Sequence, residues 1–216
     1  MRKVISTVGL TALLLAGMAF AAPAALAAAD TTCDGGLAPG TYGHVVVPEG
    51  AACFSDGPVT IKNGLEVLPG GTVVFGNEEN PVHTATINEG VRATDAANVQ
   101  IHFSTINGGL QIHGGSGPFG PPFDVTFNTI EDSVIHGAVV IDGYDGFWMG
   151  FIRNNVHGLV TLSNNVLVDE DGNEYVTNTI HGGLRCFGND PAPQVGDSEG
   201  ERNVVTGKKT GQCADL

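Results

Sequence analysis

Ile135-His136-Gly137-Ala138-Val139-Val140-Ile141 is one copy of a seven-residue unit that recurs through the chain. Apolar side chains occupy its first, fifth and seventh places, and a glycine usually lies near its centre. Further copies span residues 61–67, 87–93, 106–112, 156–162 and 180–186, with a weaker first copy at 41–47. Neighbouring copies begin 19 to 29 residues apart, a spacing typical of stacked coils that share one core.

The alternation inside each unit predicts two short strands joined by a bend. Side chains alternate with period 2 along a strand, so the fifth and seventh places share one face. The central glycine tolerates a tight corner that a residue with a Cβ would resist. From residue 30 onward no stretch shows an amphipathic helical period. We therefore expect an all-β, single-domain, right-handed parallel β-helix of about seven rungs, one for each unit.

The first 29 residues have the pattern of a secretory signal peptide. Arg2 and Lys3 give a basic start, residues 8–20 form a short apolar run, and Ala27-Ala28-Ala29 fits the small-x-small cleavage pattern. Cleavage before Asp30 would leave residues 30–216 as the β-helix domain with its two caps. We therefore expect a secreted, extracellular protein.

The charge balance excludes two classes of partner. Loss of Arg2 and Lys3 with the signal leaves 7 basic against 23 acidic residues, a formal charge of −16. Nucleic acids and anionic membranes bind clustered Lys and Arg, which this composition does not supply. We expect a monomer that binds neither of them.

Four cysteines in an exported chain predict two disulfides, for which three pairings are possible. The sequence favours Cys33 with Cys53 and Cys186 with Cys213, because each pair flanks one end of the repeat region. The ends of a solenoid are where its coils fray, so a crosslink there has the greatest use.

Three stretches carry a resemblance to a known group of proteins. They are Gly40-Thr41-Tyr42 with the run 45–48 ahead of Cys53, the recurring Val/Ile-x-Gly-x-Leu/Val units, and a tail comprising 184–193, 203–207 and 211–213. With these stretches the chain resembles small secreted actinobacterial proteins of the right-handed parallel β-helix type, whose function is not established. The resemblance implies the fold and export, and it supplies no catalytic residues.

An aromatic cluster is the first candidate binding surface. The spacing predicts that residues 142–151 leave the rod as an excursion and that 166–176 form a small hairpin turning at Asp171-Gly172. Tyr144, Phe147 and Trp148 in the excursion could stack on sugar faces. The alternative is that these rings cover the side of the rod, because aromatic side chains are usually buried.

Four acidic residues are candidates for catalysis. Glycoside hydrolysis needs two carboxyl groups, one as acid and one as base or nucleophile. Glu131 and Asp132 come from one coil and Asp142 and Asp145 from the next, so the two pairs could face one another. A lyase using an aspartate-bound calcium is a related alternative that rests on analogy with the fold alone.

Histidines occupy the second, outward place of three successive units: His136, His157 and His181. Stacked rungs would hold neighbouring rings about 5 Å apart, close enough for two of them to share a zinc ion. A ladder of plain polar side chains is the alternative. We expect no resident cofactor, with calcium and zinc as the two ions to test.

These patterns favour a secreted non-enzymatic protein that binds a polysaccharide or another cell-surface glycan. The alternatives are a small polysaccharide lyase or glycoside hydrolase, and a structural component of an extracellular matrix or coat. The repeat determines the architecture and leaves the choice among these functions open.

Overall fold

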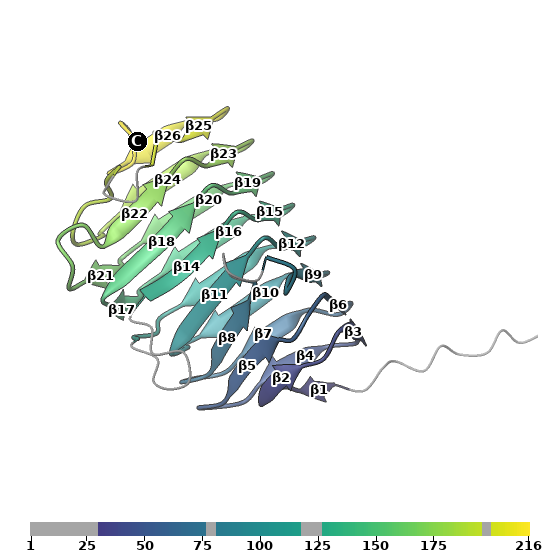
Figure 1. Ribbon diagram of the computed structural model, residues 1–216. Helices are drawn as coiled ribbons and strands as arrows, with labels where there is room; N and C mark the ends of the chain where they lie inside the picture. The colour runs from purple at the N-terminus through teal and green to yellow at the C-terminus, as the bar shows by residue number, and fades with distance from the viewer. Residues whose placement is uncertain (1–29, 77–80, 118–126, 196–199) are drawn as a thin grey trace, which may run out of the picture.

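The chain forms a stack of flattened coils built entirely from short strands (Figure 1). The computed structural model describes residues 30–76, 81–117, 127–195 and 200–216, and the predicted signal peptide lies outside these ranges. Each coil runs through three parallel sheets, called C, A and B in the order in which the chain visits them. Within the described ranges, no helix has the length and apolar character needed to cross a membrane.

Sheets C and A contain the two strands of each seven-residue unit. The strands of sheet C are β3 (Gly40–Tyr42), β6 (Val59–Ile61), β9 (Ala85–Ile87), β12 (Thr105–Ile106), β15 (Val134–Ile135), β19 (Asn155–Val156), β23 (Thr179–Ile180) and β25 (Val204–Val205). Those of sheet A are β1 (Thr31–Thr32), β4 (Val45–Val47), β7 (Leu65–Val67), β10 (Val91–Thr94), β13 (Leu110–His113), β16 (Val139–Asp142), β20 (Val160–Ser163), β24 (Leu184–Phe187) and β26 (Lys209–Gly211). The bend inside the unit is the corner between sheets C and A (the C–A corner).

Sheet B closes each coil. Its strands are β2 (Gly35–Leu37), β5 (Ala52–Ser55), β8 (Thr72–Phe75), β11 (Asn98–His102), β14 (Phe127–Glu131), β18 (Trp148–Ile152) and β22 (Asn173–Val176). Two further strands, β17 (Asp145–Gly146) and β21 (Val166–Leu167), pair with each other at the corner between sheets A and B (the A–B corner). The all-β, parallel β-helix prediction is therefore confirmed.

The apolar places of the unit form the core. In the six strong copies the first, fifth and seventh places are at most 3% exposed, and each pairs in register with its equivalent in the next coil. The first copy differs by one residue, because Tyr42 and not Thr41 pairs with Ile61. Sheet A has nine strands, two more than the seven rungs expected, since β1 and β26 add partial coils at the ends. The weak apolar signal of these end strands hid them in the sequence.

Two segments expected to leave the rod are instead part of it. Residues 142–151 contain β17 and β18, and β18 pairs in parallel with β14 and β22. The segment 166–176 is no hairpin, because β21 pairs with β17 while β22 pairs with β18. The unit spacing had suggested that residues 142–151 project, yet Gly143 adopts a left-handed φ of 73° at a regular coil corner.

Buried polar side chains bridge successive coils at the corner between sheets B and C (the B–C corner). Asn154 N donates to Asn178 Oδ1 (2.9 Å), and Asn178 N donates to Asn203 Oδ1 (3.0 Å). Ser133 N donates to Asn154 Oδ1 in the same way (3.1 Å). The chain turns here, so backbone donors cannot reach a carbonyl of the next coil, and side-chain oxygens accept their hydrogen bonds instead.

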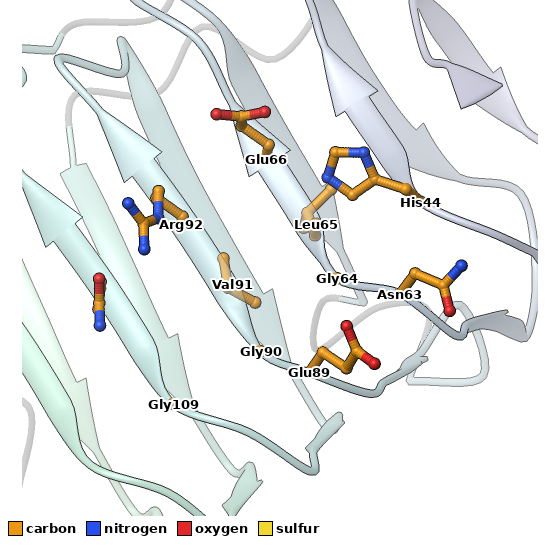
Figure 2. Close-up of a pocket in the computed structure, with 11 residues that line it drawn as sticks. His44, Asn63, Gly64, Leu65, Glu66, Glu89, Gly90, Val91, Arg92 and Gly109 are labelled. Atoms are coloured by element: carbon orange, nitrogen blue, oxygen red, sulfur yellow. The ribbon is translucent and has the colours of Figure 1, made fainter. Parts of the chain in front are cut away.

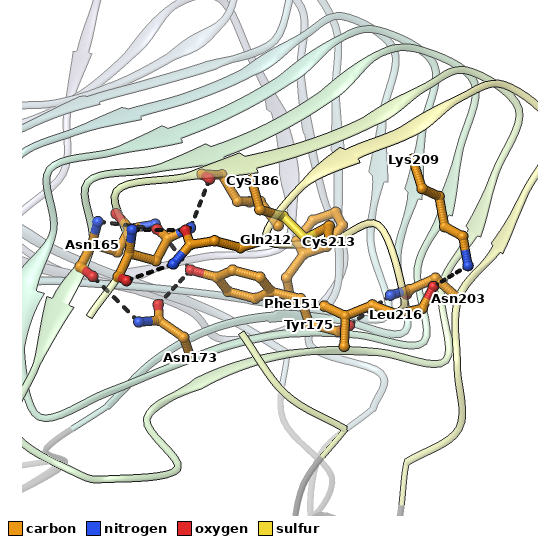
Figure 3. The surroundings of a disulfide bond; sticks show 12 residues. Phe151, Asn165, Asn173, Tyr175, Cys186, Asn203, Lys209, Gln212, Cys213 and Leu216 are labelled. Atoms are coloured by element: carbon orange, nitrogen blue, oxygen red, sulfur yellow. Dashed lines mark hydrogen bonds between the residues drawn. A yellow bond between two sulfur atoms is a disulfide. The ribbon is translucent and has the colours of Figure 1, made fainter. Parts of the chain in front are cut away.

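Both predicted disulfides are present, one at each end of the rod. Cys33 is bonded to Cys53, and Cys186 is bonded to Cys213, and all four residues are buried. Around the second bond, Gln212 Oε1 accepts from Asn189 N (3.0 Å), which continues a ladder of amide side chains along the A–B corner (Figure 3). The C-terminal cap is therefore held both by covalent and by hydrogen-bonded links to the last coils.

Candidate functional site

The outer face of sheet B carries buried polar side chains. Val99, Ile101 and Ile130 point into the core, so the residues alternating with them point outward. Among these, Gln100, His102, Thr129 and Glu174 are each no more than 6% exposed. Polar groups are rarely buried on the outside of a sheet unless they have a structural or binding role. This face is therefore the first place to look for a site.

A hollow of about 270 Å³ opens on this face, lined by Phe127, Thr129, Glu131 and Trp148. We call it the sheet B pocket. The rings of Phe127 and Trp148 meet edge to face, with centroids 5.8 Å apart and an interplanar angle of 90°. The indole lies over Gly150, where a Cβ would come within 2.4 Å of its Cη2 atom. Glycine at this position therefore lets the tryptophan form one wall.

A chain of polar side chains holds the carboxylate of this pocket in place. Glu131 Oε1 lies 2.6 Å from His102 Nδ1, a close polar contact that is not a well-aligned hydrogen bond. Glu131 Oε2 accepts a hydrogen bond from Arg153 Nη2 (3.0 Å). Arg153 also donates from Nε and Nη2 to the two oxygens of Asp132 (2.8 and 2.7 Å). Such forked pairing fixes the orientation of Arg153 and, through it, of Glu131.

Thr129 in the pocket and His102 on the rung beside it have hydrogen-bonding capacity that the described residues do not use. Thr129 is 2% exposed, and its Oγ1 has no hydrogen-bond partner within the described parts of the chain. His102 is 4% exposed, and its Nε2 is likewise without a partner there. A buried polar atom without a partner costs about 1–3 kcal/mol. A polar ligand that reached these atoms would recover that free energy.

The structure divides the three aromatic residues predicted to bind a ligand. Trp148 lines the sheet B pocket, and ligand binding by its ring stays a prediction. The prediction that Tyr144 is an exposed, ligand-binding ring is wrong. The ring is fully buried in the core, and its hydroxyl accepts a hydrogen bond from Gly117 N (3.4 Å). Burial also raises the pKa of the Tyr144 hydroxyl. Phe147 is 43% exposed but does not line the pocket.

Phe127 was missed in the sequence. Phe127 lies outside the seven-residue unit. It lines the pocket because it pairs with Trp148 where β14 and β18 run side by side. The available signal was the pairing of Phe127-Asn128-Thr129-Ile130 with the aromatic run that follows one coil later. Without knowing where β14 begins, that register could not be assigned.

The two pairs of predicted catalytic carboxylates do not face each other. Glu131 ends β14, opposite Ile152 at the far end of β18, whereas Asp142 and Asp145 precede β18. The five-residue strand between them spans about 15 Å, which exceeds the separation used by glycosidases. Asp142 Oδ1 instead accepts hydrogen bonds from Ser163 Oγ (2.6 Å) and Asn164 Nδ2 (2.8 Å). These bonds, with the charge of His113, lower the pKa of Asp142.

The three histidines form the predicted stack on the outside of the C–A corner. The ring centroids of His136 and His157 are 4.9 Å apart, and those of His157 and His181 are 4.7 Å apart, with interplanar angles near 25°. Among the described residues, no three His, Cys, Asp or Glu side chains are grouped as a metal site. Zinc binding by two adjacent rings stays a prediction.

No protein-family model, no curated protein and no solved structure matches this chain. The geometry of the sheet B pocket must therefore support any assignment of function.

Proposed function

We propose that this protein is a secreted, non-enzymatic binding protein that holds a carbohydrate in the sheet B pocket. The observation that supports the proposal best is the buried hydroxyl of Thr129, which has no partner among the described residues and belongs to a pocket lined also by two aromatic rings and a fixed carboxylate. Sugars present C–H faces to aromatic rings and hydroxyl groups to polar atoms, so this combination suits them.

The electrostatics of the pocket favour a neutral sugar. Glu131 is compensated by Arg153 and contacts His102, so the carboxylate can accept from a hydroxyl group without demanding a cationic ligand. Because both neighbours fix its position, little conformational entropy is lost when a ligand binds. The two disulfides are consistent with an oxidising, extracellular environment, which is where such glycans occur.

The same geometry argues against hydrolysis as the leading function. Glu131 is the one carboxylate lining the pocket among the described residues. Its nearest acidic neighbour in sequence, Asp132, is engaged by two hydrogen bonds from Arg153. A glycosidase needs a second carboxyl group free to act on the opposite side of the scissile bond, and no residue described here takes that position.

A glycan array followed by calorimetry on the exported, oxidised protein tests the proposal. Thr129→Val removes the hydroxyl and keeps the shape, so the affinity for the retained glycan should fall about tenfold while stability is unchanged or increased. Trp148→Ala should abolish binding in the sheet B pocket. Phe147→Ala is the matched control, since that ring is exposed and lies outside the pocket, and it should bind as the wild type does.

Two results would overturn the proposal. Wild-type affinity in Thr129→Val and Trp148→Ala would exclude the sheet B pocket as the binding site. New reducing ends or unsaturated products during incubation with the retained glycan would show an enzyme instead.

A further inference from the structure

A second hollow, of about 330 Å³, lies on sheet A in the first half of the rod (Figure 2). We call it the sheet A groove. Its floor is one column of the C–A corner, the residue just before each sheet A strand, occupied here by Gly64, Gly90 and Gly109. The same column holds His44 in the coil before these glycines and Ala138 in the coil after them. Side chains therefore close the groove at both ends.

Backbone geometry explains only part of this floor. Gly64 and Gly90 have φ values of +90° and +95°, a conformation that favours glycine whatever the surroundings. Gly109 has no such φ, and a Cβ there would meet Ala138 O at 3.0 Å, which a small shift would relieve. Ala138 and Leu159 do carry side chains in this column. Gly109 therefore extends the groove by one coil, although its backbone conformation does not call for glycine as those of Gly64 and Gly90 do.

Two rows of polar side chains form the walls. Glu66, Arg92 and Gln111 point outward from paired positions of β7, β10 and β13, so they recur at the rung spacing of about 4.8 Å. Asn63 and Glu89 face them from the corner (Figure 2). Within the described chain, none of these five side chains forms a hydrogen bond or ion pair with another protein group. Their full hydrogen-bonding capacity is open to a ligand.

The chemistry of these walls suits a neutral polyol. Arg92 offers donors, Glu66 and Glu89 offer acceptors, and the two amides offer both. Each is a planar group that can pair with two adjacent hydroxyls at once. A polyanion would meet two carboxylates in the groove and the acidic surface of the whole chain, formally −14 with the signal included. An uncharged chain of hydroxyl-bearing units meets no such penalty.

We infer that the sheet A groove binds an extended, uncharged oligosaccharide lying along the axis of the rod. The polar wall repeats once per rung, close to the advance per residue of a flat β-1,4-linked glycan. The inference rests on the proposed function for the class of ligand. The residues of the groove lie on sheet A, whereas the sheet B pocket is on another face of the rod. A protein with both sites can hold two glycan segments at once.

A titration of the exported, oxidised protein with cellotetraose, followed by amide and side-chain NMR, tests the inference. Shifts are expected at the amides of Gly64, Gly90 and Gly109, and maltotetraose, whose α-linked chain curves, should leave them unchanged. Arg92→Ala should weaken cellotetraose binding at these amides about tenfold, since a charged hydrogen bond is lost. Arg185→Ala is the matched control, because Arg185 occupies the same outward column of sheet A beyond the groove.

The outcomes separate this inference from the proposed function. Cellotetraose shifts confined to the Trp148 indole would overturn the groove and leave the sheet B pocket standing. Shifts in the groove with a silent Trp148 would support the groove and count against the pocket for this ligand. Equal shifts with maltotetraose, or no shift at Gly64, Gly90 and Gly109, would overturn the inference. Arg92 makes no hydrogen bond to any other residue that the structure describes, so its variant should fold, and the same spectra will show this.

Discussion

Two columns of polar side chains run along part of the rod, three residues apart in the coils that contain both, and different features of the backbone account for them. Asn154 and Asn178 lie in the B–C corner and are buried, whereas His157 and His181 lie in the C–A corner of the same coils and are exposed. We call them the amide column and the histidine column. Both columns repeat regularly, so the repeat alone does not show which of them the fold requires.

The backbone explains the difference. At the C–A corner the backbone ladder continues, since His157 N donates to Ile135 O and His181 N donates to Val156 O (both 2.8 Å). At the B–C corner the ladder breaks, and Asn154 N and Asn178 N donate to side-chain oxygens of the next coil. The amide column is therefore required by buried donors. In the described parts of the chain, the histidine side chains accept no hydrogen bond from a buried backbone donor, so the fold does not require any particular residue type in the histidine column.

Asn178→Ala should produce the largest loss of stability. The Asn178 side chain accepts from Asn154 N (2.9 Å) and donates to Phe151 O (2.7 Å) and Asn203 Oδ1 (2.8 Å), all buried. Its removal leaves donors and acceptors unpaired and opens a cavity, for about 3 kcal/mol of unfolding free energy. Urea unfolding measures this loss.

Asn178→Ser is the control for that experiment. Serine occupies the same column at Ser104 and Ser133, where its hydroxyl accepts from the backbone of the preceding coil. The serine variant should therefore keep part of the lost stability. A loss below about 0.5 kcal/mol for Asn178→Ala would mean that the amide column is as dispensable as the histidine column.

Tyr175→Phe tests the matching network at the A–B corner, with a smaller effect. The buried hydroxyl of Tyr175 donates to Asn173 Oδ1 (2.5 Å) and accepts from Asn165 Nδ2 (2.9 Å). Loss of both bonds should cost about 1–2 kcal/mol in urea unfolding.

The same residue predicts a dependence on alkaline pH. Burial raises the pKa of Tyr175 far above its ordinary 10.0, so above pH 10 the unfolded chain binds fewer protons than the folded one. Stability contributed by this group is therefore present below pH 10 and falls as the pH rises beyond it. Tyr175→Phe should flatten that fall, and an unchanged pH profile would contradict the assignment.

The histidine column and the core could be predicted from the sequence, while the amide column and the sheet B pocket could not. Inward places and outward places follow from a period of 2, so Ile135 and His136 were assigned correctly to opposite faces. The amide column is visible in the sequence, because Asn154 and Asn178 each lie two residues before a unit. Its structural role could not be predicted, because that role depends on which backbone N–H groups lack a carbonyl partner.

The sheet B pocket depends on registers that loop lengths conceal. His102 and Glu131 are adjacent rungs yet lie far apart in sequence, and Phe127 meets Trp148 only because β14 and β18 pair in register. Tyr144 was a candidate for exposure because the repeat spacing predicted an excursion over residues 142–151, whereas its backbone N donates to Asn165 Oδ1 at a corner that continues into the next coil. Periodicity identifies faces reliably and identifies neighbours only where the coil length is constant.

Ser163→Ala tests a smaller, electrostatic effect at the partly buried Asp142. The hydrogen bond from Ser163 is the largest cause of the lowered pKa of Asp142. Burial acts in the opposite direction, and the hydrogen bond from Asn164 lowers the pKa further. Asp142 therefore contributes stability above pH 3.8 that is lost as the pH falls through its lowered pKa. Ser163→Ala should move the pKa up toward 3.8 in a carboxyl NMR titration.

Thr210→Ala is the control, since Thr210 lies two rungs farther along sheet A, after β24. It should leave the pKa of Asp142 where it is. A pKa that does not move in Ser163→Ala would show that the neighbouring amide and the charge of His113 suffice.

His157→Asn should have the smallest effect, below about 0.5 kcal/mol in urea unfolding, because the ring is exposed and its backbone donor is already bonded. Asn154→His in the same coil is the opposite exchange and should be severely destabilising. A cost above about 1 kcal/mol for His157→Asn would show that the stacked rings hold the coils together. His157 is the ring that contacts both neighbours, so an ion bridging two adjacent rings of the stack has to use it. A zinc-dependent rise in melting temperature that disappears in His157→Asn would therefore give the histidine column the metal-binding role that the fold itself does not require.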